Sequence, residues 1–303
     1  MAEPRLHYVQ CPIGDAVGAP QGSGHRMAYW EWGAPDAAHA VVCAHGLTRQ
    51  GRDFDVLAQA LVARAPHPLR VLCPDVAGRG RSDWLADPQH YQVPVYTAAI
   101  LAMLAQLKLT QVDWVGTSMG GLIGMGVCTT AASVGAQVRR LVINDVGPTI
   151  EIAALRRIGV YLGQPLRFDT PEQAAAALWA VSSSFGPHTP QQWLDLCRPM
   201  LKAASDGAGW VLHYDPAIAL PFRMVTDELA EKGQAMAWAV YDQIQAPTLL
   251  LRGALSDLLS AATAADMGQR GPRARLHTVD GVGHAPTLIA ADQIDVVADF
   301  LFA

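Results

Sequence analysis

The chain has 303 residues, of which 51% are hydrophobic and only 16% are charged. Ordinary globular proteins carry about 25% charged residues, so this composition excludes an intrinsically disordered chain. Fifty alanines account for part of the apolar excess. No apolar run approaches the ~18 residues that a membrane-spanning helix needs. The length suits about two domains, or one large α/β domain with an insertion.

The net charge and the cysteine content indicate which partners and which cellular compartment to expect. The net charge is −5, and the 19 Arg and 3 Lys are scattered, which argues against nucleic acid binding. Five widely spaced cysteines without a C-x-x-C pair argue against a disulfide framework or a zinc site, and for a reducing compartment. The first residues show no apolar segment typical of a secretion signal. We therefore expect a cytoplasmic protein that acts on a small molecule without a metal or other cofactor and away from membranes. A homodimer stays open.

The predicted elements begin with two strands, 6–9 and 27–32, which the Gly/Pro-rich stretch 12–24 would join as a loose hairpin. Short apolar runs, each followed by a turn with Gly or Asp, then alternate with helical segments. Strands buried on both faces show this pattern, and the alternation predicts a parallel sheet with right-handed crossovers. The runs are 40–44, 69–73, 112–116, 141–144, 248–252 and 275–279, and the predicted helices are 54–65, 96–108, 119–132 and 286–302.

Residues 148–244 interrupt this rhythm with helical periodicity and no convincing strand. Within them, Thr170 is a good N-cap, with Pro171 at the first helical position and Gln173 at the third. The interval holds four of the eight Trp and ten of the 21 aromatic residues. We expect a helical cap, or lid, over a core made of residues 1–147 and 245–303. Its aromatic side chains would form a small core of their own, line a substrate pocket, or do both.

The strongest chemical signal is the G-x-S-x-G pattern at Gly116, Ser118 and Gly120, where a buried strand runs directly into a helix. Such a turn is tight and strained, and it needs small residues two before and two after the serine. The turn would expose the Ser118 hydroxyl beside the unpaired N–H groups of a helix N-terminus. The pattern therefore predicts a nucleophilic serine.

A nucleophilic serine needs a base, and His284 is the best placed of the ten histidines. It follows the last predicted strand on a Gly-bracketed loop, at the sheet edge where open α/β folds bind ligands. An orienting carboxylate would fix its tautomer. Asp257 preserves the chain order Ser…Asp…His and follows the strand next to that of His284, so we favour it. Asp145, after the preceding strand, stays open as the alternative acid.

A tetrahedral intermediate also needs an oxyanion hole of preorganised N–H donors. The backbone N–H of Met119 directly follows the nucleophile. The second donor is expected in the loop after the first parallel strand, where Gly46 lets the chain turn closely and the Leu47 N–H donates. His45 is predicted to hold this loop through hydrogen bonds to nearby backbone. Arg49, just beyond, could meet a substrate carboxylate, although a solvated loop arginine is the simpler interpretation.

Together these motifs resemble the α/β-hydrolase superfamily, in the group with a helical cap inserted after the sixth strand. The matching segments are the H-G pair at 45–46, the D-x-x-G-x-G-x-S turn at 75–82, the S-M-G-G elbow at 118–121 and the G-H pair at 283–284. The resemblance covers nearly the whole chain. It implies an α/β-hydrolase fold with a mostly parallel eight-stranded sheet, whose first two strands form an antiparallel hairpin. It also implies the triad Ser118, Asp257 and His284.

Departures from related groups narrow the chemistry. Dehalogenases and epoxide hydrolases of this fold carry an Asp nucleophile, whereas this chain has Ser118. Carbon–carbon-bond hydrolases usually place Trp after the catalytic His, where this chain has Ala285. Cofactor-free haloperoxidases lack a long cap. The sequence therefore predicts a carboxylesterase-like serine hydrolase that cleaves a small or medium ester through an acyl-enzyme. A C–C hydrolase, thioesterase, lactonase or hydroxy-acid oligoester hydrolase with the same triad, and a ligand-binding receptor of the same fold, stay open.

Overall fold

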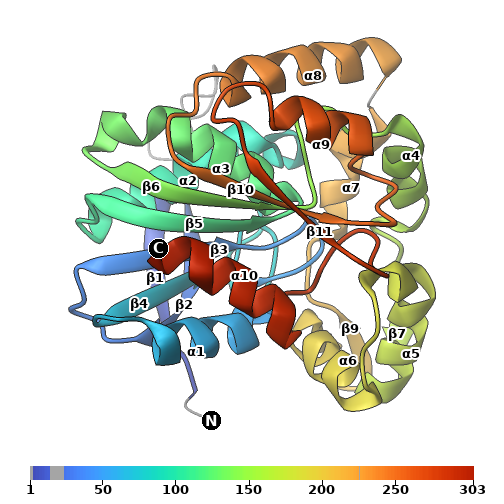
Figure 1. The fold of residues 1–303 in the computed structure, drawn as a ribbon. Coiled ribbons are helices and arrows are strands. Elements are labelled where there is room, and N and C mark those ends of the chain that lie inside the picture. Colours follow the sequence, from blue (N-terminus) through green and yellow to red (C-terminus); the bar gives the residue numbers. More distant parts are fainter. Residues whose placement is uncertain (1–2, 14–23, 225) are drawn as a thin grey trace.

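An eight-stranded sheet forms the centre of the computed structural model, which describes residues 3–13, 24–224 and 226–303 (Figure 1). The strand order is β1-β2-β4-β3-β5-β6-β10-β11. β1 pairs antiparallel with β2 and β2 with β4, and all other neighbours are parallel. The strands are β1 (Arg5–Pro12), β2 (Gly24–Gly33), β3 (His39–Ala44), β4 (Leu69–Pro74), β5 (Gln111–Thr117), β6 (Gln137–Asn144), β10 (Thr248–Gly253) and β11 (Arg275–Val279). The predicted fold class is confirmed, although residues 14–23 of the predicted hairpin connection lie outside the described residues.

Helices cover both faces of the sheet, which explains why its central strands β3, β4, β5 and β10 are almost entirely buried. Successive residues of one strand point to opposite faces; Val41 packs in the core beneath α1 (Asp55–Arg64) and α10 (Ala291–Phe302), and Val42 packs in the core on the other face. That other face is covered by α2 (Val93–Gln106), α3 (Met119–Thr130), α8 (Asp227–Tyr241) and α9 (Ala261–Met267). Both valines are fully buried.

The interval between β6 and β10 contains both helices and strands. Its elements before α8 are α4 (Ile152–Tyr161), β7 (Arg167–Phe168), α5 (Pro171–Ser182), α6 (Pro190–Cys197), β8 (Leu201–Ala203), β9 (Trp210–Leu212) and α7 (Ala219–Arg223). The expectation of an interval without strands was wrong, because β7, β9 and β8 form a small antiparallel sheet. Strands of two or three residues are too short to show an alternating pattern. The predicted cap of α5 is confirmed, since the Thr170 hydroxyl accepts a 3.2 Å hydrogen bond from the Gln173 N–H.

Two helices begin or pack differently from the sequence expectation. The last helix starts at Ala291 rather than Pro286, because Leu288 takes a left-handed conformation with φ of 59° that interrupts a helix. α8 packs against α3 of the core, and its Tyr241 is fully buried with its hydroxyl donating to the Met267 carbonyl at 2.7 Å. The end of the interval 148–244 is therefore part of the layers that cover the sheet, whereas α4 to α7 gather at one end of the sheet (Figure 1).

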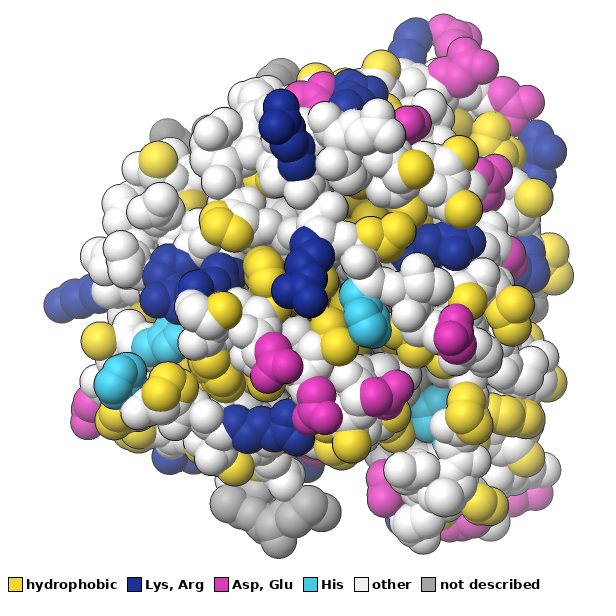
Figure 2. All heavy atoms as spheres, viewed as in Figure 1, with side chains coloured by type: hydrophobic (Ala, Val, Ile, Leu, Met, Phe, Trp, Pro, Cys, Tyr) yellow, Lys and Arg dark blue, Asp and Glu magenta, His cyan; other side chains and the backbone are white. Residues whose placement is uncertain are grey.

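The surface and the helices give two further observations. On the face in Figure 2, Lys and Arg side chains are interspersed with Asp and Glu and do not form a stripe of one sign. Over residues 3–13, 24–224 and 226–303, the structure contains no helix with the length and apolar character required to cross a bilayer.

Candidate active site

Ser118 occupies a strained turn between β5 and α3, at the middle of the sheet. Its φ of 53° and ψ of −118° lie in a region that non-glycine residues rarely adopt. The flanking glycines are required for steric reasons. A Cβ on Gly116 would lie 2.2 Å from the Gly120 carbonyl oxygen, and a Cβ on Gly120 would lie 2.0 Å from the Ala44 carbonyl oxygen. This close packing holds the serine hydroxyl at the carboxyl end of the strand.

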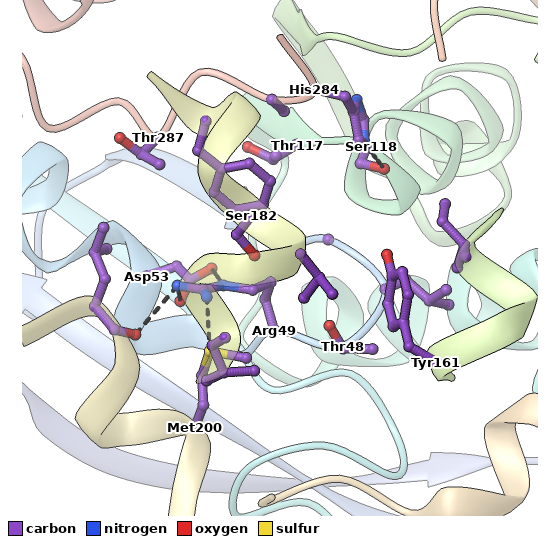
Figure 3. A pocket seen from close by; sticks show the side chains of 18 of the residues that line it. Thr48, Arg49, Asp53, Thr117, Ser118, Tyr161, Ser182, Met200, His284 and Thr287 are labelled. Carbon is purple, nitrogen blue, oxygen red and sulfur yellow. Dashed lines mark hydrogen bonds and ion pairs between the residues drawn. The ribbon is translucent and has the colours of Figure 1, made fainter. Parts of the chain in front are cut away.

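His284 and Asp145 complete a hydrogen-bonded line that starts at Ser118. The His284 Nε2 lies 3.0 Å from the Ser118 Oγ, and its Nδ1 lies 2.8 Å from the Asp145 Oδ2. Asp145 directly follows β6, its side chain is fully buried, and its Oδ1 accepts a 2.9 Å hydrogen bond from the Gly253 N–H. Three strand ends thus supply the line, from β5, β6 and the loop after β11. Figure 3 shows Ser118 and His284 side by side.

Asp257, which the sequence favoured as the orienting acid, does not contact His284. It is half exposed, and its Oδ2 pairs with the Arg157 Nη2 of α4 at 2.7 Å. The preceding residue explains the difference, because the loop after β10 turns Ser256 inward and its hydroxyl donates to the Asp145 Oδ2 at 2.7 Å. The next side chain along the loop points outward instead. The alternative acid, Asp145, is the one that the fold brings to His284.

The Gly46–Leu47 peptide is oriented by His45. The Gly46 carbonyl accepts from the His45 Nδ1 at 2.7 Å and from the Arg49 N–H at 3.2 Å. The His45 Nε2 in turn accepts from the Val76 N–H at 2.9 Å. Burial lowers the pKa of His45 to about 3, so the ring stays neutral and bridges the two loops. In a planar trans peptide the N–H points opposite to the carbonyl, so the Leu47 N–H is directed away from His45.

The other backbone N–H of the candidate oxyanion hole, beside that of Leu47, belongs to Met119. This N–H is free to donate, because the first N–H of a helix has no partner within that helix. Met119 begins α3 directly after Ser118. Gly46 differs from expectation. A Cβ there would meet nothing closer than 3.7 Å, at the Ser118 Cβ and the Arg49 side chain, so no close turn demands glycine.

Three polar residues that the sequence did not single out support this arrangement. Asn144 is fully buried and donates to the Thr117 hydroxyl at 3.0 Å and to the Pro286 carbonyl at 2.8 Å, which ties the ends of β5 and β6 to the loop that carries His284. Ser256 binds Asp145 as described. Arg79 is fully buried and donates from Nε to the Leu47 carbonyl at 2.8 Å. Asn144 could have been found as a polar residue ending an apolar strand, whereas Arg79 carried no such signal.

Two cavities meet at the serine. The His284 cavity, about 180 Å³, is lined by His284, Arg49 and Asp53 among others. The Met119 cavity, about 600 Å³, is lined by Met119 and a set of mostly apolar side chains. Leu47, Ser118 and Ile158 line both cavities.

The aromatic residues between β6 and β10 divide between the two expected roles. Trp179 and Trp193 stack edge to face with centroids 5.0 Å apart, in a small core of their own. Tyr161 and Phe185 line the His284 cavity, and Phe222 lines the Met119 cavity. These two tryptophans therefore stabilise the segment, whereas four of its six smaller aromatic side chains, Tyr161, Phe185, Tyr214 and Phe222, line the cavities.

The sheet topology and the sharp turn that carries Ser118 between β5 and α3 are those of an α/β-hydrolase fold. Residues 41–300 match the family model described as the alpha/beta hydrolase family. The chain belongs to this family.

Individual relatives add detail. The chain is 49% identical over 301 residues to a 3-hydroxybutyrate-oligomer hydrolase of Cupriavidus necator, covering 99% of this chain and 98% of that protein. It is 28% identical to a pimeloyl-[acyl-carrier protein] methyl ester esterase of Xanthomonas campestris pv. campestris, covering 84% of this chain and 91% of the relative. Among solved structures, an alpha/beta hydrolase from Novosphingobium aromaticivorans superposes with a TM-score of 0.81 at 35% identity, covering 99% of both chains.

Proposed function

We propose that this chain is a serine hydrolase of carboxylic esters, with Ser118 as nucleophile, His284 as base and Asp145 as the orienting acid. The observation that carries the proposal is the continuous line of hydrogen bonds from Asp145 through His284 to Ser118, at 2.8 and 3.0 Å. A nucleophile within reach of a base, which is itself held by a third group, is the arrangement that covalent ester hydrolysis requires.

The geometry supports a two-step reaction. With its Nδ1–H donated to Asp145, His284 presents a free Nε2 lone pair to the Ser118 hydroxyl. It removes that proton as Oγ attacks the ester carbonyl, and the N–H groups of Leu47 and Met119 stabilise the oxyanion. The intermediate collapses as His284 protonates the leaving alcohol. Water then attacks the acyl-enzyme with His284 again as base.

The part of the segment 148–244 that precedes α8 contributes the cap in this proposal. Residues of α4 line both cavities and residues of α5 line the His284 cavity, and Arg157 of α4 pairs with Asp257 of the core at 2.7 Å. A cover of this kind excludes water from the reacting groups and selects the substrate. A reducing, cytoplasmic location fits the same proposal, since all five cysteines are free thiols.

We further propose esters of hydroxy acids, such as linear 3-hydroxybutyrate oligomers, as the substrate class. The support is the 49% identity to a 3-hydroxybutyrate-oligomer hydrolase over nearly the whole of both chains. The site is compatible with such substrates, because an internal ester bond carries a chain on each side and Ser118 lines two cavities.

The test compares the Ser118→Ala variant with the wild type on a 3-hydroxybutyrate trimer, a p-nitrophenyl ester and a matched thioester. Loss of the nucleophile should lower kcat by more than ~10³-fold on every ester and abolish labelling by a fluorophosphonate probe. The exposed Ser133→Ala variant is the control and should retain both. Near wild-type turnover by Ser118→Ala would end the proposal. A preference for the thioester would overturn the substrate class alone.

A further inference from the structure

The two cavities are lined by different residues of the candidate active site. His284 lines only the smaller one and Met119 lines only the larger one. Ser118 lies at their junction together with Leu47 and Ile158. An ester bound at Ser118 therefore has one end on the His284 side and the other on the Met119 side.

Proton transfer decides which end lies on which side. In the acylation step the bond from Ser118 Oγ to the acyl carbon forms, and the bond from that carbon to the alcohol oxygen breaks. The proton taken from Ser118 by the His284 Nε2 passes to the alcohol oxygen. That oxygen must lie within hydrogen-bond reach of Nε2 when the bond breaks.

We propose that the alcohol half of the substrate occupies the His284 cavity and the acyl half occupies the Met119 cavity. The inference rests on the proposed function, because it assumes an acyl-enzyme on Ser118. It adds a direction of binding, which neither the triad nor the family membership specifies for this chain.

The His284 cavity offers hydrogen-bond donors suited to a polar alcohol. Arg49, with only 11% of its side chain exposed, donates from Nε and Nη2 to the Asp53 carboxylate at 2.6 and 2.8 Å. Its Nη1 faces the sulfur of Met200, a weak acceptor. Figure 3 shows this group at the opposite end of the cavity from Ser118 and His284. An oxygen of the alcohol half would be a better acceptor for Nη1 than the thioether is.

The Met119 cavity suits a longer and less polar group. At about 600 Å³ it lies within the ~300–1,000 Å³ typical of ligand pockets, whereas the His284 cavity, about 180 Å³, is smaller. Leu122, Leu155 and Phe222 contribute apolar walls. Arg79 also lines it, but this side chain is fully buried and donates to the Leu47 carbonyl and the Tyr96 hydroxyl.

For a linear hydroxy-acid oligomer, this direction has a chemical consequence. The acyl half of any cleaved ester ends in a hydroxyl group, and the alcohol half ends in the free carboxylate. The carboxyl-terminal unit would therefore lie in the cavity that is lined by the Arg49–Asp53 ion pair.

The first experiment uses the unmodified chain and two isomeric esters, methyl octanoate and heptyl acetate. The long chain is on the acyl side in the first ester and on the alcohol side in the second. We expect kcat/KM for methyl octanoate to exceed that for heptyl acetate by more than about tenfold. The octanoyl chain would fit in the Met119 cavity, whereas the heptyl chain would have to enter the smaller His284 cavity, and each methylene group that fits a pocket contributes to kcat/KM. Equal values, or a preference for heptyl acetate, would overturn the assignment.

The second experiment fills each cavity in turn, with Val181→Trp in the His284 cavity and Leu155→Trp in the Met119 cavity. Burst kinetics with p-nitrophenyl octanoate separate acylation from deacylation. The acyl-enzyme has already lost its alcohol, so Val181→Trp should slow acylation about tenfold and leave deacylation within about twofold. Leu155→Trp should slow both steps and shift the preference toward acetate.

Fluorophosphonate titration counts the folded, reactive sites in each variant, so misfolding cannot imitate either pattern. The reverse pattern, or two variants with the same effect on both steps, would overturn the inference while an acyl-enzyme still forms. If wild-type Ser118 forms no acyl-enzyme at all, the proposed function fails first. The isomeric esters give an answer even where a tryptophan variant does not fold.

Discussion

Ser256 donates its hydroxyl hydrogen to the same Asp145 oxygen that faces His284, at 2.7 Å. This carboxylate is therefore fully buried and bonded on both of its oxygens, since the Gly253 N–H binds the other at 2.9 Å. A carboxylate held in this way can fix the tautomer of a histidine and stabilise the imidazolium during the reaction.

The acid assignment makes the first prediction. Asp145→Asn should lower kcat by roughly 10⁴-fold, because an amide can present the wrong hydrogen-bonding partner to His284. Asp257→Asn, the matched control on a half-exposed residue paired with Arg157, should change kcat less than about fivefold. Steady-state kinetics on one ester check both. A larger loss in the Asp257 variant would reverse the assignment.

Arg79 makes the second prediction, because it contacts both residues of the candidate oxyanion hole. Its Nε donates to the Leu47 carbonyl at 2.8 Å, and its Nη2 lies 3.6 Å from the Met119 sulfur. Arg79→Met should lower kcat by about 10- to 100-fold with little change in KM, since the loop that presents the Leu47 N–H loses its support. Arg81→Met, at the exposed cation two residues on, is the control. A rise in KM alone would indicate a binding role instead.

Two glycine substitutions should change stability in opposite directions. A Cβ on Gly120 would lie 2.0 Å from the Ala44 carbonyl oxygen, so Gly120→Ala should lower the free energy of unfolding by more than about 3 kcal/mol. Gly159, within α4, has no atom within 4 Å of the position of an added Cβ. Gly159→Ala should therefore raise the free energy of unfolding by ~0.5–1 kcal/mol, because alanine has a higher helix propensity than glycine. Urea unfolding measures both, and a destabilised Gly159→Ala variant would contradict the geometry.

His45 predicts a pH dependence of stability. Burial lowers its pKa from 6.5 to about 3 in the folded chain. As the pH falls below 6.5, the unfolded chain binds a proton that the folded chain does not. The stabilising contribution of the neutral His45 is therefore fully present above pH 6.5, and the free energy of unfolding falls as the pH falls toward about 3.

The measurement compares urea unfolding of the wild type and His45→Gln at several pH values. Between pH ~4 and ~5.5 the wild-type free energy of unfolding should fall more steeply, by up to ~1.4 kcal/mol per pH unit. The other titrating groups act in both proteins, so the difference in slope belongs to His45. Parallel curves would show that this histidine is not held neutral.

Much of the fold could be predicted because its signals are local. Each buried strand of the parallel sheet is an apolar run, and both faces are covered, so the runs stand out from the helices between them. The strands β7, β8 and β9 could not be found, since two or three residues carry no period. The start of α10 was missed because a left-handed Leu288, favoured by no sequence rule, separates Pro286 from the helix.

The candidate site was predictable as far as single elements determine it. Ser118 and His284 each carry a local signature, namely the G-x-S-x-G turn and the glycine-bracketed loop. The acid was not predictable, because Asp145 and Asp257 both follow strands and both preserve the chain order. Only the inward turn of the loop after β10, which places Ser256 against Asp145, distinguishes them.

Backbone strain at Ser118 implies a trade-off between stability and activity. Its φ of 53° costs of order 1–3 kcal/mol that a glycine would not incur. A Ser118→Gly chain should therefore fold more stably while losing its nucleophile. Asp145 also has a positive φ, of 59°, so two of the three residues in the proposed triad occupy left-handed backbone. Selection for thermal stability alone would thus tend to remove the groups that carry the chemistry.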